Sequence, residues 1–242
     1  DVAIFASAIR PDLWMALYES LASTNKCSFK MFFCGHVRPG FNLPENFVHV
    51  YSEMDPAPCV EIAYRQALAE NSKYIMHFTD DCIMPPGILD SLIEEHKAHG
   101  GELVVGPSFI PPCRPGQKGR PISLHMHTGH TETPLLPIFQ MVKRSTAIKT
   151  GGVDKRFKAI MWDVDRLLRL HEMKTVDFKV CDHLVISEIP IPGSLYKRTI
   201  PIDGPVLDSL WDCYVTLGAP VFRKDKIIEW PEEELIYSIE EK

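Results

Sequence analysis

Two adjacent aspartates, Asp80 and Asp81, follow a short apolar run at residues 74–78. The run predicts a buried strand, and α/β proteins place their ligand sites beyond the carboxyl ends of such strands. Carboxylate oxygens suit hard cations such as Mg²⁺ or Mn²⁺, which proteins commonly hold with one or two carboxylates plus the phosphates of a substrate. The pair therefore indicates a nucleotide-diphosphate site, although two aspartates could also merely cap the turn that follows.

The elements that would position this pair alternate along the first half of the chain. Apolar runs predict strands at residues 2–5, 29–34, 47–51, 74–78 and 103–105, and helical spacing predicts helices at 11–21, 60–68 and 87–99. This alternation is typical of an α/β sheet. In the second half we expect a strand at 138–142, a short helix from Ser145, a helix at 162–171, strand structure at 176–189 and a helix around 206–217. The acidic run at 232–242 is most simply a solvated terminus.

Composition narrows the class of protein. The 242 residues are 45% hydrophobic and 24% charged, as in ordinary globular chains. A formal net charge of -6 argues against nucleic acid as the main partner, because binding to a phosphate backbone needs a basic surface. No apolar stretch is long enough to span a membrane, so any membrane contact would be peripheral. Seven cysteines without a CxxC pair indicate reduced thiols and favour the cytoplasm.

Four short motifs occur in a fixed order along the chain. They are Ala-Ile-Phe-Ala-Ser-Ala-Ile-Arg at 3–10, Ala-Tyr-Arg-Gln-Ala-Leu at 63–68, Thr-Asp-Asp at 79–81, and Gly-Gly-Val-Asp-Lys-Arg-Phe at 151–157 leading to Trp-Asp-Val-Asp at 162–165. In these motifs, from residue 2 to about residue 187, the chain resembles the family 2 glycosyltransferases with the GT-A fold. Each motif alone is a weak signal, and their common order carries the resemblance.

The resemblance implies a fold and a division of labour. The GT-A fold is a Rossmann-like mixed sheet flanked by helices, and we expect one such domain over residues 1–242. Residues 1–105 would form the nucleotide-sugar-binding half, residues 106–200 the acceptor half, and residues 201–242 a C-terminal helix and tail. The expected partners are a nucleotide-diphospho-sugar, most simply a UDP-sugar, and a carbohydrate or glycoconjugate acceptor.

The resemblance also implies a role for each matched residue. Asp163 would be the general base that takes the proton of the acceptor hydroxyl, in a transfer that inverts the anomeric carbon. Asp81 would hold a divalent metal, Mn²⁺ or Mg²⁺, that stabilises the leaving diphosphate. The other matched residues would bind the nucleotide sugar: Ala6, Ser7, Ala8, Arg10, Arg65, Thr79, Asp80 and Trp162. Asp165, on another face of the predicted helix, is expected to be structural or a cap.

Three positions depart from the family pattern. Thr79 stands where the metal motif usually opens with an acid, and Trp162 stands where an acid commonly precedes the base. Residues 34–36, Cys-Gly-His, follow the second predicted strand, where many relatives supply an aspartate to the nucleobase. A retaining transferase, a nucleotidyltransferase and a non-catalytic sugar-nucleotide-binding module therefore stay open as alternatives.

A long loop is predicted at residues 107–133, where prolines and glycines break all periodicity. We hypothesise that it forms a lid over the donor or the acceptor. Its histidines, His125, His127 and His130, could hold a transition metal, since imidazole is a common ligand. No carboxylate partner is evident beside them, so contact with the acceptor or plain surface is the preferred interpretation.

Overall fold

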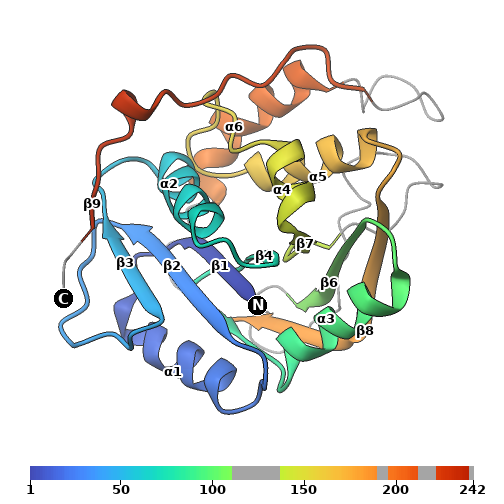
Figure 1. The fold of residues 1–242 in the computed structure, drawn as a ribbon. Helices are drawn as coiled ribbons and strands as arrows, with labels where there is room; N and C mark the ends of the chain where they lie inside the picture. Colours follow the sequence, from blue (N-terminus) through green and yellow to red (C-terminus); the bar gives the residue numbers. More distant parts are fainter. Residues whose placement is uncertain (111–136, 190–195, 212–221, 240–242) are drawn as a thin grey trace, which may run out of the picture.

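The computed structural model describes residues 1–110, 137–189, 196–211 and 222–239 of the chain. Strands and helices alternate through these ranges (Figure 1). In order they are β1 (Val2–Ser7), α1 (Pro11–Ala22), β2 (Phe29–Gly35), β3 (Phe47–Tyr51), α2 (Pro56–Ala69), β4 (Tyr74–His77), β5 (Cys82–Ile83), α3 (Ile88–His99), β6 (Leu103–Ile110), β7 (Met141–Lys143), α4 (Arg144–Thr150), α5 (Trp162–Glu172), β8 (Asp177–Glu188), α6 (Tyr196–Leu210), the 3-10 turn η2 (Glu232–Glu234) and β9 (Ser238–Ile239).

The strands of the described residues form one mixed nine-stranded sheet in the order β5-β8-β6-β7-β4-β1-β2-β3-β9. Strands β3, β2, β1 and β4 are parallel, with Val2 of β1 opposite Phe29 of β2 and Tyr74 of β4. Strand β7 joins β4 in the antiparallel sense, while β6 and β8 are parallel to each other. The expected mixed α/β sheet flanked by helices is confirmed.

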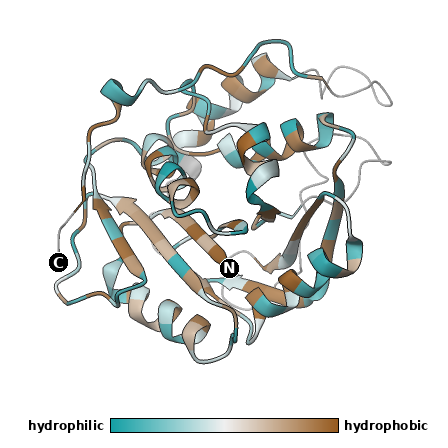
Figure 2. Ribbon diagram, in the orientation of Figure 1, coloured by the Kyte–Doolittle hydropathy of each residue, from teal (hydrophilic) through white to brown (hydrophobic). Residues whose placement is uncertain are grey.

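Helices cover both faces of the sheet, α1 and α3 on one side and α2, α4, α5 and α6 on the other (Figure 1). Alternate residues of β1 point to opposite faces of the sheet. Ile4 lies in the core under α1 and α3, and Phe5 lies in the core under α2 and α5. A strand buried on both faces reads as a nearly continuous apolar run, which is why the central strands are mostly hydrophobic (Figure 2). No helix in the described ranges is long and apolar enough to cross a membrane.

Several predicted boundaries hold and others shift. The strand at 47–51, the helix from Trp162 and the strand structure at 176–189 are confirmed. The predicted loop begins later than expected, because residues 107–110 belong to β6. Helix α6 begins ten residues before the predicted position and runs through two prolines, because apolar residues of its last turns pack into the core. The proposed lid and the histidines at 125, 127 and 130 lie at 111–136, outside the described residues.

The acidic residues 232–234 of the C-terminal run are exposed, as expected of a solvated segment, but residues 232–239 also attach to the rest of the fold. Strand β9 adds to the sheet beside β3, with Ile239 opposite Val50. Arg65 of α2 forms an ion pair with Glu232, and Leu235 is only 7% exposed. The charge pattern alone could not predict this attachment, because the basic partners of these acids lie far away in sequence. Figure 1 shows the segment running past α2 to reach the sheet edge.

A buried ionic network connects Arg223, near the start of the described C-terminal stretch 222–239, to Asp154 and to α5. Arg223 donates from Nη2 to Asp154 at 2.6 Å and from Nε to Asp165 at 3.0 Å, and both aspartates are fully buried. Arg169 and the indole of Trp211 also donate to Asp165. Burial alone would raise the pKa of Asp154, but hydrogen bonds from Arg156 and Arg223 hold that pKa well below its ordinary value. Asp165 is thus placed in a structural network and not in an open site.

Replacing Arg223 by Gln should lower the free energy of unfolding by about 3 kcal/mol at pH 7, because two buried carboxylates each lose a charged donor. A carboxyl group whose pKa is lowered by folding stabilises the protein above its unfolded pKa of about 3.9, and that contribution is lost as the pH falls towards the folded value. The difference between wild type and variant should therefore shrink from pH 7 to pH 3. Urea unfolding at both pH values measures it, with the exposed Arg198→Gln as control; equal stabilities at pH 7 would contradict the role of the network.

Candidate functional site

The strand order reverses beside β1, which has β2 on one side and β4 on the other. Strands β1 and β4 are parallel, so they end at the same edge of the sheet, at Ser7 and His77. Open α/β sheets bind ligands in the crevice outside the carboxyl ends of strands at such a reversal. The turn that leads from β1 into α1 and the turn that carries Asp80 and Asp81 meet there.

Asp80 holds these two turns together. Its Oδ2 accepts hydrogen bonds from the backbone N–H groups of Ile9 and Arg10, both at 2.7 Å, and from the indole of Trp14 at 3.2 Å. Its Oδ1 accepts from Nη1 of Arg10 at 2.5 Å. The side chain is 1% exposed. With these donors in place, Asp80 shapes the turn after β1, and its contact with a nucleotide sugar stays a prediction.

Asp81, unlike Asp80, has a carboxylate oxygen that the described residues leave without a donor. It is 6% exposed, and its Oδ1 is buried with no hydrogen-bond partner in the described part of the chain. Its Oδ2 lies 3.3 Å from Nη1 of Arg10. Burial raises the pKa of Asp81 above its ordinary value, and Arg10 only partly offsets this. A buried carboxylate oxygen without a donor is the kind of group that an ion or a ligand completes.

Glu188 is a third carboxylate at this edge, beside Asp80 and Asp81, and the sequence reasoning missed it. Strand β8 ends beside β5, with Glu188 opposite Cys82, and the N–H of Ile189 donates to the carbonyl oxygen of Asp81 at 2.7 Å. Burial and the charge of Asp81 raise the pKa of Glu188 to about 7. The antiparallel pairing of a two-residue strand creates this neighbourhood, and no periodicity in the sequence could reveal it.

Asp81 and Glu188 together fit a divalent cation. Both offer oxygen ligands, Oδ1 of Asp81 is buried without a hydrogen-bond partner among the described residues, and the charge of Asp81 disfavours the ionised form of Glu188. The described residues hold no group of three or more potential metal-ligating side chains. A cation here would therefore take its remaining ligands from water and from substrate oxygens, as Mg²⁺ commonly does.

The small residues at the end of β1 and directly after it lead into the same turn. Ala6 and Ala8 are buried, while Ser7 is half-buried. Ala8 donates its backbone N–H to the carbonyl of Cys34 at 2.8 Å, and a Cβ on Gly35 would lie 2.1 Å from the oxygen of Ala8. Only glycine allows this approach of β2 to the turn. Thr79 places its hydroxyl 2.9 Å from the sulfur of Cys82, beside Asp81.

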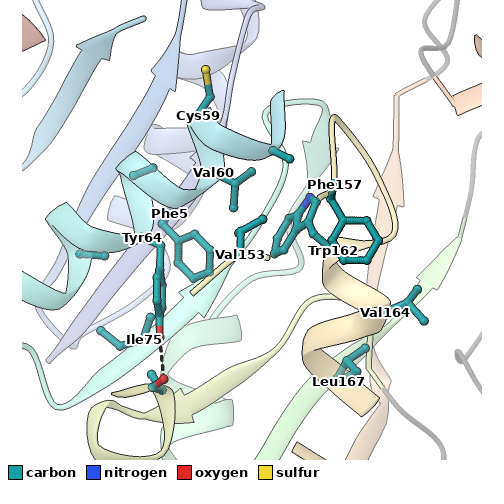
Figure 3. Close-up of a cluster of buried hydrophobic side chains, with 14 of the residues drawn as sticks. Phe5, Cys59, Val60, Tyr64, Ile75, Val153, Phe157, Trp162, Val164 and Leu167 are labelled. Atoms are coloured by element: carbon teal, nitrogen blue, oxygen red, sulfur yellow. Dashed lines mark hydrogen bonds between the residues drawn. The ribbon is translucent and has the colours of Figure 1, made fainter. Parts of the chain in front are cut away.

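The start of α5 reaches the end of β4. Trp162 is 5% exposed and meets His77 edge to face, with 4.7 Å between ring centroids. Figure 3 shows its indole among Phe157, Val153 and Phe5, so the ring lies within the core and does not present an open face for stacking on a sugar. Asp163, the next residue, is half-buried in the first turn of α5. The positive end of the helix dipole there favours an ionised carboxylate.

An unusual backbone conformation precedes Asp163. Met161 has φ of 63°, in the left-handed region that non-glycine residues rarely adopt. Residues held in such conformations persist only where their surroundings fix them, and they cluster at functional sites. Met161 is 7% exposed, so core contacts are available to hold it. The direction in which α5 presents Asp163 is thus set by the packing of residues 161 and 162.

Arg65 is not brought to this site. Its guanidinium donates to Glu61, to Glu232 and to the carbonyl oxygen of Trp230, so its contacts lie on α2 and on the C-terminal segment. A separate hollow of about 200 Å³ lies beside it, lined in part by Glu61 and Gly152. A Cβ on Gly152 would lie 2.2 Å from the carboxylate of Glu61, which explains the need for glycine in the motif at 151–157.

Comparison with known proteins supports the fold. No family model matches the sequence, and no curated protein matches it. Among solved structures, S. aureus TarS superposes with a TM-score of 0.54 at 10% identity over 89% of this chain and 40% of that chain. TarS 1-349 in complex with UDP gives 0.57 at 10% identity over 89% of this chain and 67% of that chain. TarS 1-349 in complex with UDP-GlcNAc gives 0.57 at 9% identity over 80% of this chain and 60% of that chain.

These likenesses define the class of fold. The nine-stranded sheet and its flanking helices match a GT-A-like glycosyltransferase fold. The chain spans less than half of the longer TarS chain that it matches. At about a tenth of identical residues, the likeness establishes the architecture, and the activity has to be argued from the site.

Proposed function

We propose that this chain is a nucleotide-sugar glycosyltransferase of the family 2 type, which moves a sugar from a UDP-sugar to a hydroxyl group of a carbohydrate or glycoconjugate. The observation that carries the proposal is the position of Asp81 at the strand reversal of a GT-A-like sheet, with a buried carboxylate oxygen that has no hydrogen-bond partner in the described ranges. Two of the TarS structures that share the fold are complexes, one with UDP and one with UDP-GlcNAc, which supports a UDP-linked donor.

The donor would lie across the turn between β1 and α1. Asp80 fixes the backbone of this turn through its hydrogen bonds to Ile9 and Arg10. Ser7 and Arg10, on either side of the turn, are both partly exposed and would be available to the donor. The guanidinium of Arg10 can donate to diphosphate oxygens in a forked geometry. Asp81 and Glu188 would hold the divalent cation, Mn²⁺ or Mg²⁺. When bound, such a cation stabilises the negative charge of the leaving diphosphate.

The acceptor side would be organised by α5. In this proposal Asp163 accepts the proton of the acceptor hydroxyl while that oxygen attacks the anomeric carbon, and the product has the inverted configuration. Trp162 fixes the base through its contact with His77, since it is buried against the strand that carries the Asp80–Asp81 turn. The mechanism thus links the acceptor and donor sides through the end of β4.

Asp81→Asn and Glu188→Gln test the proposal on the donor side. Each keeps the shape of the side chain and removes a negative charge from the cation site. We expect Asp81→Asn to abolish the Mn²⁺-dependent part of UDP affinity, and Glu188→Gln to weaken it by about 10-fold, the lower end of the range for altered metal-site residues. Isothermal titration of UDP with and without Mn²⁺ measures both effects.

The matched control is Asp208→Asn, an exposed aspartate on α6. It should bind UDP and Mn²⁺ like the wild type. Circular dichroism of each variant should show an intact fold, because Oδ1 of Asp81 has no hydrogen-bond partner among the described residues. Unchanged Mn²⁺-dependent affinity in Asp81→Asn would remove that residue from the metal site.

A further inference from the structure

Arg10 is a positively charged residue that lies next to the carboxylates of the candidate donor site. Its Nη1 lies 2.5 Å from Oδ1 of Asp80 and 3.3 Å from Oδ2 of Asp81, and its positive charge also acts on Glu188. Three carboxylates thus share one guanidinium. A group so placed neutralises only part of their charge, which leaves the site attractive to a divalent cation.

The two contacts of Arg10 differ in strength. The contact with Asp80 is short and belongs to a set of hydrogen bonds that closes the turn after β1. The contact with Asp81 is longer than an ordinary hydrogen bond between charged groups and joins a partly exposed guanidinium to a side chain that is 9% exposed. Arg10 can therefore leave Asp81 while the backbone of the turn stays fixed by Asp80.

We propose that Arg10 is a displaceable counter-ion: in the free protein it covers Asp81, and it moves to the diphosphate when the donor binds, so that the metal and the nucleotide each favour the binding of the other. This inference rests on the proposed function. In the free protein, a divalent cation at Asp81 would lie next to the guanidinium and be repelled by it. A bound diphosphate removes that repulsion, because it offers Arg10 a bidentate partner.

Thermodynamic linkage between the two ligands predicts the direction in which their binding affinities change. If UDP strengthens Mn²⁺ binding by some factor, Mn²⁺ must strengthen UDP binding by the same factor. Replacing Arg10 by Gln removes the competing charge, so Mn²⁺ alone should bind about 5- to 10-fold more tightly than it binds to the wild type. UDP alone should bind more weakly, since a guanidinium contact with phosphate is lost. The factor of mutual strengthening should fall.

The experiment measures Mn²⁺ binding from the paramagnetic resonance signal of free Mn²⁺, without UDP and with saturating UDP. The proteins are the wild type, Arg10→Gln, Arg10→Lys and the exposed control Arg198→Gln. Arg10→Lys keeps the positive charge, so Mn²⁺ alone should bind to it about as weakly as to the wild type. Arg10→Lys also keeps a hydrogen-bond donor for Asp80, so it gives a folded variant for comparison if Arg10→Gln has a folding defect.

The outcomes separate the two claims. Tighter binding of Mn²⁺ alone to Arg10→Gln, but not to Arg10→Lys or Arg198→Gln, supports the displaceable counter-ion. Synergy in the wild type with unchanged or weaker binding of Mn²⁺ alone in Arg10→Gln overturns the counter-ion and leaves the proposed function standing. A wild type that binds neither Mn²⁺ nor UDP overturns both.

Discussion

Asp163→Asn should lower the rate of sugar transfer by about 10²–10⁴-fold while UDP and Mn²⁺ still bind, because a general base contributes a factor of that size. The substitution keeps the shape of the side chain in the first turn of α5 and removes the carboxylate that would accept the proton. Binding of the donor is measured by titration calorimetry, and transfer by the release of UDP in the presence of acceptor. The exposed Asp208→Asn serves as the matched control.

Two results would contradict this assignment. One is turnover of Asp163→Asn at close to the wild-type rate. The other is a product that retains the anomeric configuration of the donor, since a retaining transferase does not need this base. In either case the first turn of α5 would keep only its structural role, with Asp163 complementing the helix dipole.

Asp80→Ala should lower the free energy of unfolding by about 3–5 kcal/mol and abolish donor binding. The carboxylate is 1% exposed and accepts from two backbone N–H groups, an indole and a guanidinium, so its removal leaves buried donors without a partner. Urea unfolding measures the loss of stability, and UDP titration below the unfolding transition measures binding.

The control for Asp80 is Asp177→Ala, because Asp177 is an exposed aspartate that pairs only with His99 at the surface among its described contacts. An exposed ion pair contributes about 0–1 kcal/mol, so this variant should unfold almost like the wild type. If Asp80→Ala has the stability of the control, the carboxylate does not organise the turn after β1.

The sequence predicted the central layers of the fold because their signals are local. The strands at 29–34 and 47–51 and the helix from Trp162 are marked by apolar periodicity within the elements themselves. The edges of the sheet were not predictable in this way. Strands β5 and β9 have two residues each, and only their pairing with β8 and β3 defines them. Prolines at 201 and 205 likewise hid the first part of α6, which tertiary packing maintains.

The residues of the candidate site were likewise predictable where the signal is local and not where distant segments meet. The sequence placed Arg10, Thr79, Asp80 and Asp81 in one site, and the structure brings them together at the reversal of strand order. Glu188 was missed, since it joins Asp81 through a strand pairing between segments about a hundred residues apart. Arg65 lies elsewhere because its donors are taken by Glu61 and by the C-terminal segment, a partner that local sequence could not reveal. A cytoplasmic location stays a prediction.

The central claim is that the turn between β1 and α1 binds a nucleotide-diphospho-sugar together with a divalent cation. Thermal unfolding of the wild type and of Asp81→Asn, with a set of nucleotide sugars and with or without Mn²⁺, tests it most directly. A ligand at 100 times its dissociation constant should stabilise the native state by about 2.7 kcal/mol. We predict that a UDP-sugar with Mn²⁺ raises the melting temperature of the wild type and not that of Asp81→Asn. An unchanged wild-type melting temperature with every nucleotide sugar, with and without Mn²⁺, would contradict the claim.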